Sequence, residues 1–404
     1  MPGDIGPPEP DLTADDMVRR AVAMRDALRA GQAECEEIRR IPAATHTAFV
    51  DAGFYRVLQP RRFGGYEFDV PSFLRIMIEA ARGCPSCGWV LALTSGHTHT
   101  LSFFALDVQS SVYGATGDAR VPFCGNPGGS ATPVDGGYMI RGNWDYASGC
   151  DIATHFLCAA VLLDRDGGLD TSSGGPDMAL ALLNPDELKI VDNWDTLGMR
   201  GTGSKRLAVK GSVIPAERLV RGHMRRGPGG HPNPMYSGRI LSLLMSEIAA
   251  VATGIAWAAL DEYETILRDR RIANRPFSLR FEHHEYQHHF GEAWALVETA
   301  ESALLDAGRR YMQWSRAHIE QNDPFTDEKD QRLLLVEQRV VRLAADAVEL
   351  LFRTAGSRST RRGERLERYM RDVAELRTHG GLQHDRTMEQ FGRIHFGLPA
   401  IPGT

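Results

Sequence analysis

Residues 142–151 read Gly142-Asn-Trp-Asp-Tyr-Ala-Ser-Gly-Cys-Asp151, and this stretch decides how the rest of the chain is interpreted. At a period of two, Trp144, Tyr146 and Ser148 fall on one face of a predicted strand, which Gly149 ends. That face would offer two flat rings and a hydroxyl, which suit a planar heteroaromatic ligand. An aromatic strand face is more often plain core, so the neighbouring segments must decide.

Helical patterns occupy the chain before residue 120. Thr13-Ala-Asp-Asp16 resembles a capping box, and apolar residues then recur at helical spacing. One further buried helix is predicted over Trp89–Leu106. Residues 1–12 are rich in Pro and Gly and are expected to be disordered, which leaves an N-terminal helical domain over residues 13–119.

Short β-rich runs separated by turn residues fill residues 120–222. This pattern predicts a small antiparallel β domain. Its clearest strands are expected over Tyr138–Asn143, Phe156–Leu163, Met178–Leu183 and Leu207–Ile214.

A Gly/Pro-rich linker is expected over residues 223–237, and long helical patterns fill residues 238–404. Apolar residues there recur at steps of three and four, which predicts a four-helix bundle. The fold class is therefore α+β in three parts. The bundle helices are expected over Ile240–Arg268, Glu285–Ile319, Glu328–Ala355 and Arg365–His379.

The composition is that of a soluble globular protein. The 404 residues include 43% hydrophobic residues, and the net charge of -6 would attract neither nucleic acid nor an anionic membrane. The first ten residues lack the basic and apolar regions of a signal peptide, so a cytoplasmic location is expected.

Neither cysteines nor histidines predict a metal site. Six cysteines lie mostly in apolar segments, as reduced thiols do, and Cys84-Pro-Ser-Cys87 has no second pair nearby. The paired histidines at 283–284 and 288–289 have no accompanying catalytic pattern. We therefore expect no bound metal.

Four ordered segments resemble signatures of the acyl-CoA dehydrogenase superfamily. They are Phe123-Cys-Gly-Asn-Pro-Gly-Gly-Ser130, the strand at 142–148, Leu197-Gly-Met-Arg-Gly-Thr-Gly-Ser204 with Val213-Ile-Pro215, and Gly238-Arg239. The resemblance covers about residues 13–400. It implies that family's fold, with an N-terminal helical domain, a central antiparallel β domain and a C-terminal bundle.

Other segments favour one subgroup over the dehydrogenases. The turn Arg377-Thr-His-Gly-Gly381 lacks the glutamate base that dehydrogenases commonly carry there. Ser86-Cys-Gly-Trp-Val with His97, and Arg371-Asp-Val with His379, resemble oxygenase components of two-component flavin monooxygenases. The p-hydroxyphenylacetate and 3-hydroxy-secosteroid hydroxylases are of that kind.

This resemblance implies an enzyme that uses reduced flavin and O2 to hydroxylate a small aromatic, phenolic in particular, through a flavin C4a-hydroperoxide. Reduced FMN or FAD would come from a separate NAD(P)H-dependent flavin reductase. The chain has no G-x-G-x-x-G after a strand, which agrees with electrons arriving from elsewhere. Members of the superfamily are usually homotetramers.

The resemblance also implies roles for particular residues. His97 and His379 would be acid/base groups, and Ser148 would hydrogen-bond the flavin N5 region. His99 and Trp89 would line the substrate pocket. The remaining flavin-binding positions would be Trp144, Tyr146, Asn126 and Ser130 in a Gly-rich turn, and Arg271 or Arg275 at a phosphate across a subunit boundary.

Three alternatives stay open at this point. An N-hydroxylase or sulfur oxygenase would share the fold and the cofactor chemistry. An acyl-CoA dehydrogenase is less favoured because of the missing glutamate. A helical scaffold that has lost its flavin would be non-enzymatic, and it would bind flavin in neither oxidation state.

Overall fold

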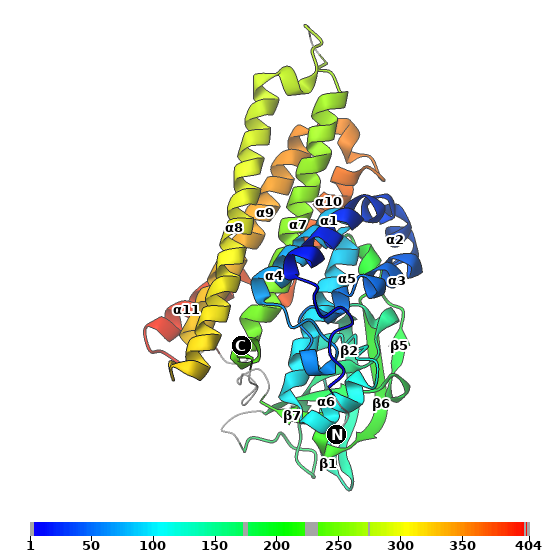
Figure 1. Ribbon diagram of the computed structural model, residues 1–404, viewed down its shortest axis with the longest axis vertical. Coiled ribbons are helices and arrows are strands. Elements are labelled where there is room, and N and C mark those ends of the chain that lie inside the picture. Colours follow the sequence, from blue (N-terminus) through cyan, green and yellow to red (C-terminus); the bar gives the residue numbers. More distant parts are fainter. Residues whose placement is uncertain (1–3, 173–176, 223–232, 274, 400, 402–404) are drawn as a thin grey trace.

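The computed structural model describes residues 4–172, 177–222, 233–273, 275–399 and 401. Helices, a sheet and a long bundle follow one another in the predicted order (Figure 1). Helix α1 begins with the predicted capping box, in which Thr13 Oγ1 and the Asp16 carboxylate each accept the other residue's backbone N–H. The first group comprises α1 (Ala14–Ala30), α2 (Gln32–Ile38), α3 (Ala43–Asp51), α4 (Val70–Gly83), α5 (Pro85–Gly96) and α6 (Leu106–Tyr113).

Residues 4–12 are ordered, contrary to the prediction. The Ile5 N–H donates to the Arg62 carbonyl at 3.1 Å, and Glu9 pairs with Arg20 at 2.6 Å. Composition alone misled here because these partners come from elsewhere in the chain. Residues 1–3 of the predicted disordered segment lie outside the described residues.

The single helix predicted over Trp89–Leu106 is also wrong. Helix α5 ends at Gly96, and His97–Phe103 forms the 3-10 helix η3. Thr98 donates to the Ser95 carbonyl at 2.6 Å and Thr100 to the His97 carbonyl at 2.5 Å. Hydroxyls bonded to carbonyls three residues back offer the backbone a local alternative to the α-helix.

The β region forms one seven-stranded sheet in the order β5-β6-β2-β1-β3-β4-β7. Neighbouring strands are antiparallel, except that β1 and β3 are parallel, so the prediction of a purely antiparallel sheet is wrong in this pair. The reason is that the chain reverses direction between β2 and β3, and β3 then pairs with β1 and not with β2, so it runs in the same direction as β1. The strands are β1 (Phe123–Val134), β2 (Gly137–Ala147), β3 (Phe156–Leu162), β4 (Met178–Leu183), β5 (Lys189–Val191), β6 (Lys205–Ile214) and β7 (Leu219–Arg221).

The C-terminal bundle extends away from the sheet along the long axis of the molecule (Figure 1). Helix α7 is long and apolar enough to cross a membrane, but 94% of its most apolar window is buried against the other helices. A core helix of a bundle has this composition. The bundle comprises α7 (Ile240–Asp269), α8 (His284–Glu320), α9 (Asp327–Thr354), α10 (Arg365–Leu376) and the short α11 (His384–His395).

The predicted linker is only partly described. Residues 223–232 lie outside the described residues, and Pro234–Ser237 forms a short 3-10 helix. Met235 and Tyr236 in that helix are fully buried, and the Tyr236 hydroxyl donates to the Leu58 carbonyl at 2.7 Å. This part of the segment is therefore packed structure and not a free connection.

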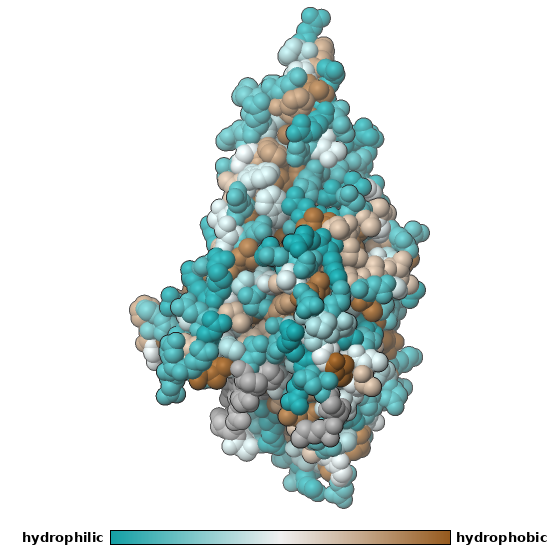
Figure 2. Space-filling model, in the orientation of Figure 1, coloured by the Kyte–Doolittle hydropathy of each residue, from teal (hydrophilic) through white to brown (hydrophobic). Residues whose placement is uncertain are grey.

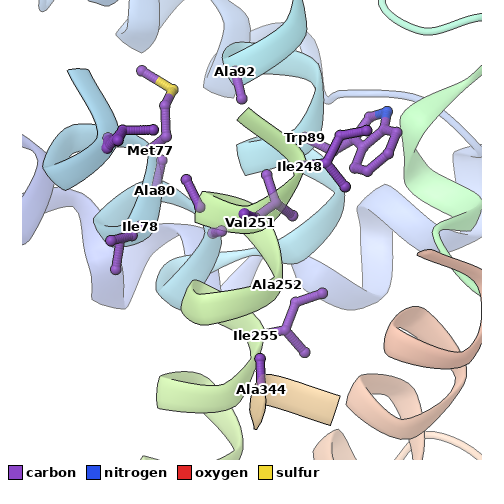
Figure 3. Close-up of a cluster of buried hydrophobic side chains, with 14 of the residues drawn as sticks. Met77, Ile78, Ala80, Trp89, Ala92, Ile248, Val251, Ala252, Ile255 and Ala344 are labelled. Carbon is purple, nitrogen blue, oxygen red and sulfur yellow. The ribbon is translucent and has the colours of Figure 1, made fainter. Parts of the chain in front are cut away.

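The N-terminal helices and the bundle share one hydrophobic core. Side chains of α4, α5 and α7 meet there, Trp89 among them (Figure 3). At Gly254 on α7, a Cβ would lie 2.6 Å from the Ala81 Cβ, so glycine allows α4 and α7 to approach closely. Because this shared core crosses the boundary expected between the N-terminal helical domain and the bundle, the division into separate domains stays a prediction. The face of the molecule shown in Figure 2 is largely hydrophilic.

Candidate active site

The strand alternation expected across residues 144–148 breaks at Tyr146. Its φ of 64° is left-handed, and the pairing of β2 with β6 shifts between Trp144 and Ala147. Trp144 packs in the sheet core, where its indole N–H donates to the Ala159 carbonyl at 2.6 Å, whereas Tyr146 is 64% exposed. The prediction that the two rings share a ligand-facing side is wrong, because an extra residue at a bulge reverses the alternation.

Ser148 lies just beyond this bulge and joins a buried chain of hydroxyls. The Trp89 indole N–H donates to Ser148 Oγ at 2.8 Å, Ser148 Oγ lies 2.7 Å from Ser204 Oγ, and Ser204 Oγ lies 2.7 Å from Thr202 Oγ1. All four residues are buried. The network therefore joins α5, the end of β2 and the segment before β6.

The number of protons in this network matters for ligand binding. Because an indole N–H can only donate, Ser148 must accept from Trp89. If Thr202 donates to Ser204 and Ser204 donates to Ser148, both lone pairs of Ser148 are occupied. The Ser148 hydroxyl proton is then left for a further acceptor.

The segment that carries Ser204 is anchored by α10. The Met199 N–H donates to the Asp372 carboxylate at 2.6 Å, and a Cβ at Gly198 would collide with the Arg371 carbonyl. Asp372 is buried, and burial raises its pKa to about 7. A glycine and a buried acid thus fix this turn against α10.

His97 begins η3 and is buried between two partners. Its Nδ1 accepts the backbone N–H of Phe123 at 3.1 Å, and its Nε2 lies 3.4 Å from the Glu247 carboxylate. Burial, with a smaller contribution from His379, lowers the pKa of His97 to about 3.

His379 lies in the turn after α10, half-buried. Its ring meets the Trp89 ring edge-on at 6.0 Å, and its Nδ1 accepts the Gly381 N–H at 3.1 Å. Burial lowers the pKa of His379 to about 4. Trp89 therefore touches both Ser148 and His379, so the structure brings three of the predicted site residues together.

Both imidazoles are held in the same tautomer. Since Nδ1 accepts from a backbone N–H in each ring, the proton of the neutral ring is on Nε2. With lowered pKa values, His97 and His379 are neutral near pH 7 and offer an N–H donor. This arrangement favours a donor role over the proton-accepting role expected from the sequence.

Glu247 was missed by the sequence interpretation. It is fully buried on α7, and burial alone raises the pKa of its carboxyl well above the usual range. The signal was present, because Glu247 is the one charged residue between Ile240 and Leu260. A buried acid in an apolar run is a candidate functional group.

Three other predicted positions lie elsewhere. His99 is fully buried, with Nε2 3.0 Å from the Met235 carbonyl and its ring stacked on Tyr236, so it is packed in the core. Asn126 and Ser130 belong to strand β1, and the predicted Gly-rich turn is therefore wrong. The backbone stays extended there, with a register shift against β3 between Cys124 and Gly129.

Arg271 and Arg275 lie in the exposed connection between α7 and α8. That connection is at the end of the molecule farthest from the sheet (Figure 1). The Arg271 guanidinium donates to the Phe277 carbonyl at 2.9 Å. Neither arginine can therefore reach Ser148 of the same chain.

The predicted thiols are free and buried, and the fold gathers three of them. Cys84 and Cys87 meet Cys35 of α2, with the three sulfurs within 4.8 Å of one another. The histidines at 283–289 form no such group within the described residues. A closed zinc site takes four ligands, and the absence of a metal stays a prediction.

Family comparisons agree with this architecture. The family described as "Acyl-CoA dehydrogenase, N-terminal domain" matches residues 11–113, and "Acyl-CoA dehydrogenase, C-terminal domain" matches residues 246–384. Together they cover more than half of the chain. The chain belongs to the acyl-CoA dehydrogenase family.

Its relatives define the subgroup. The flavin-dependent monooxygenase oxygenase subunit HsaA of Rhodococcus jostii is 29% identical, over 95% of this chain and 98% of that protein. The FADH(2)-dependent resorcinol hydroxylase oxygenase component of a Rhizobium species is 29% identical, over 95% and 94%. The crystal structure of 3-HSA hydroxylase from Rhodococcus sp. RHA1 superposes with a TM-score of 0.84 at 27% identity, over 95% and 98%. These relatives confirm the expected subgroup, the oxygenase components of flavin-dependent monooxygenases.

Proposed function

We propose that this protein is the oxygenase component of a two-component flavin-dependent monooxygenase that hydroxylates a small phenol. The observation that carries this proposal is the buried Ser148 network, in which the Trp89 indole donates to Ser148; when Ser204 also donates to Ser148, the Ser148 hydroxyl proton is left for a ligand. The relatives named for resorcinol and p-hydroxyphenylacetate hydroxylation support a phenolic substrate.

The residues present fit a reduced flavin, either FMN or FAD. Ser148 would donate toward the N5 region, and Tyr146 would cover part of the ring system. Asn126 and Ser130 on β1 and the arginines at 271 and 275 of a neighbouring subunit are the further candidates. When bound, reduced flavin reacts with O2 and supplies the oxygen-transfer chemistry.

The protein's own part is to place donors and exclude water. Trp89 fixes the Ser148 hydroxyl and packs against His379, so these groups hold one orientation before any ligand arrives. The Nε2–H groups of His97 and His379 provide donors for oxygen atoms of substrate or cofactor. The buried surroundings keep both rings neutral and reduce proton leakage.

The oxygenase class implies a separate reductase. We propose an NAD(P)H-dependent flavin reductase that acts transiently or through freely diffusing flavin. A homotetramer would bring the α7–α8 connection of one subunit to the sheet of another, which is the arrangement that Arg271 and Arg275 require. We also propose a cytoplasmic location, since such a reductase depends on NAD(P)H.

Rapid mixing tests this function directly. The protein is mixed anaerobically with photoreduced FMN or FAD, pulsed with O2 and followed by rapid-scan absorbance. We expect a long-lived near-ultraviolet absorbance that precedes oxidised flavin. Reoxidation at the rate of free flavin, or reduction of bound oxidised flavin by an acyl-CoA, would contradict the proposal.

A further inference from the structure

Three buried cysteines meet where α2 packs against the start of α5. Cys35 of α2, with Cys84 and Cys87 at the start of α5, places its sulfur within 4.8 Å of the other two. The sulfurs of Cys35 and Cys87 are 3.6 Å apart. Gly201 makes room for this group, because a Cβ there would collide with the Cys35 sulfur. The proposed flavin chemistry uses none of the three thiols.

The start of α5 places Cys84 and Cys87 in a reactive arrangement. Cys84 is the N-cap, Pro85 begins the helix and Cys87 is its third residue. The first thiol of such a Cys-x-x-Cys pair lies beside unpaired backbone N–H groups and the positive end of the helix dipole. Both favour the thiolate form, which is the nucleophilic form of cysteine.

The neighbours of Cys84 also favour its thiolate. Contacts with the Cys35 and Cys87 thiols, the Cys87 backbone N–H and the Arg368 guanidinium lower the pKa of Cys84 well below its usual range, although burial opposes them. The pKa of Cys87 is raised by its contacts with Cys35 and Cys84, and by burial. Cys84 is therefore the nucleophile of the pair, and Cys87 keeps its proton.

Cys84 also lines a small polar cavity. The cavity volume is about 10 Å³, which is room for one water-sized molecule. The Arg200 side chain in its wall is 29% exposed and pairs with the exposed Asp195, so the cavity lies directly beneath the surface. Only a small uncharged oxidant suits this approach to Cys84. The charged residues that line the cavity are Glu36, Arg200, Arg368 and Asp372.

We propose that Cys84 and Cys87 form a reversible redox pair that hydrogen peroxide oxidises to a disulfide, with Cys35 as the neighbour that supports the Cys84 thiolate. The Cys84 sulfur attacks one peroxide oxygen, the O–O bond breaks, and the departing hydroxide takes up the proton that Cys84 lost. The Cys87 sulfur then attacks the Cys84 sulfenic acid, the S–O bond breaks, and a second water leaves with the Cys87 proton. Each sulfur loses one electron, and each peroxide oxygen gains one.

The resting protein is the reduced form of this pair. All six cysteines are free, as thiols are in a reducing compartment, where disulfides of this kind are transient. Reduced flavin that reacts with O2 without forming product releases hydrogen peroxide, so the proposed function would supply the oxidant. The redox pair does not depend on that function, because peroxide from any source would oxidise it.

A second pair of buried thiols provides the matched comparison. Cys124 and Cys158 are partners on the neighbouring strands β1 and β3. Burial and the contact with Cys124 raise the pKa of Cys158 well above its usual range, and neither residue begins a helix. If closeness alone decided oxidation, this pair would react as well. We expect it to stay reduced.

Thiol mapping tests the proposal on the full chain. Reduced protein, freed of reductant, is incubated with millimolar hydrogen peroxide, then unfolded, alkylated with N-ethylmaleimide and digested. Mass spectrometry should find Cys84 and Cys87 without alkylation, in a peptide lighter by two hydrogens, and the other four of the six cysteines alkylated. Treatment with dithiothreitol before alkylation should restore all six.

Variants separate the three roles. Cys87→Ala should stop at a sulfenic acid on Cys84, which dimedone traps, and Cys84→Ala should leave every remaining thiol reduced. Cys35→Ala should form the same disulfide about threefold more slowly, because a less stabilised thiolate is scarcer but more nucleophilic. Cys35→Ser keeps a hydrogen-bond donor and should recover most of the rate.

Four outcomes would overturn the proposal: thiols that peroxide leaves unchanged, equal oxidation of Cys124 and Cys158, a disulfide that includes Cys35, or stoichiometric zinc in the purified protein, which would make the three cysteines metal ligands. The mapping of the unmodified protein needs no variant, so it stands if a variant fails to fold. Because the peroxide is added directly, failure of the proposed flavin chemistry would leave this test intact.

Discussion

The indole N–H of Trp89 donates to the hydroxyl oxygen of Ser148 at 2.8 Å. This bond joins the middle of α5 to the end of β2, two elements far apart in the sequence. It decides the orientation of Ser148, because an indole can donate but cannot accept. The same Trp89 ring lies against His379, so one side chain orders two parts of the site.

Ser148→Ala should separate catalysis from flavin binding. The variant leaves the Trp89 N–H and one Ser204 hydrogen bond without a partner, which should lower the free energy of unfolding by about 1–3 kcal/mol. Reduced flavin should still bind, but more of it should be oxidised without forming product. Product and hydrogen peroxide per reduced flavin are the measurements.

Ser315→Ala is the control for this experiment, because Ser315 is equally buried but lies on α8 and makes no hydrogen bond to this network. Its product yield should equal that of the unmodified protein. An unchanged yield in Ser148→Ala as well would remove Ser148 from the reaction.

The imidazoles of His97 and His379 should stay neutral across the usual working range. Their pKa values are lowered from 6.5 to about 3 and about 4 by burial, so neither should gain a proton between pH 8 and pH 5. Chemical shifts of the ring protons, assigned by loss of signal in His97→Gln and His379→Gln, measure this directly. A midpoint near pH 6.5 for either ring would contradict the donor role.

The lowered pKa values of His97 and His379 also predict how the free energy of unfolding changes with pH. Each lowered pKa means that the unfolded chain binds more protons than the folded protein between the folded value and 6.5. The free energy of unfolding should therefore fall as the pH falls through this window. Each His→Gln variant should lose part of that dependence.

Asp372 should make the free energy of unfolding depend on pH in the opposite direction. Its pKa is raised from 3.8 to about 7, so the folded protein binds more protons than the unfolded chain between these values. Its contribution to stability should therefore decrease as the pH rises from about 4 to about 7, by up to about 4 kcal/mol for a shift of this size.

Asp372→Asn tests this, because asparagine keeps an oxygen that can accept the Met199 N–H but does not ionise. Urea unfolding at pH 5 and pH 8 should show the variant gaining stability relative to the unmodified protein at the higher pH. An equal difference at both pH values would show that Asp372 does not titrate in this window.

The sequence predicted element types better than it predicted which side chains face a ligand. The capping box at Thr13 and the periodicity of α7–α10 are local signals, and the structure confirms them. The exposed Tyr146 and the buried Trp144 depend on a bulge that alternation cannot show. Likewise, the order of residues 4–12 depends on Arg20 and Arg62, which are distant in the chain.

The sequence identified only some of the residues of the candidate site. Motif resemblance indicated His97, Ser148 and His379, and Trp89 joins Ser148 and His379 in the structure. Glu247 belongs to no motif, and its position beside His97 depends on the close approach of α5 and α7. Periodicity predicts each helix, but contacts between helices require their relative rotation, which one sequence does not supply.

The arginines of the α7–α8 connection test whether the site is shared between subunits. Arg271 and Arg275 belong to the α7–α8 connection, which lies at the end of the molecule opposite the sheet (Figure 1). If they bind the flavin of a neighbouring subunit, Arg271→Ala with Arg275→Ala should weaken reduced-flavin binding without disturbing Ser148. Light scattering should show a tetramer for this double variant, as for the unmodified protein.

Hybrid oligomers then distinguish a shared site from a local one. Subunits with Ser148→Ala and subunits with both arginine substitutions are each defective alone. In oligomers assembled at random from equal amounts of both subunits, a shared site is intact where Ser148 comes from one subunit and both arginines come from its neighbour. About a quarter of the sites would meet this condition. Product formation should therefore recover on mixing. A site confined to one chain would show no recovery, and that outcome would remove both arginines from flavin binding.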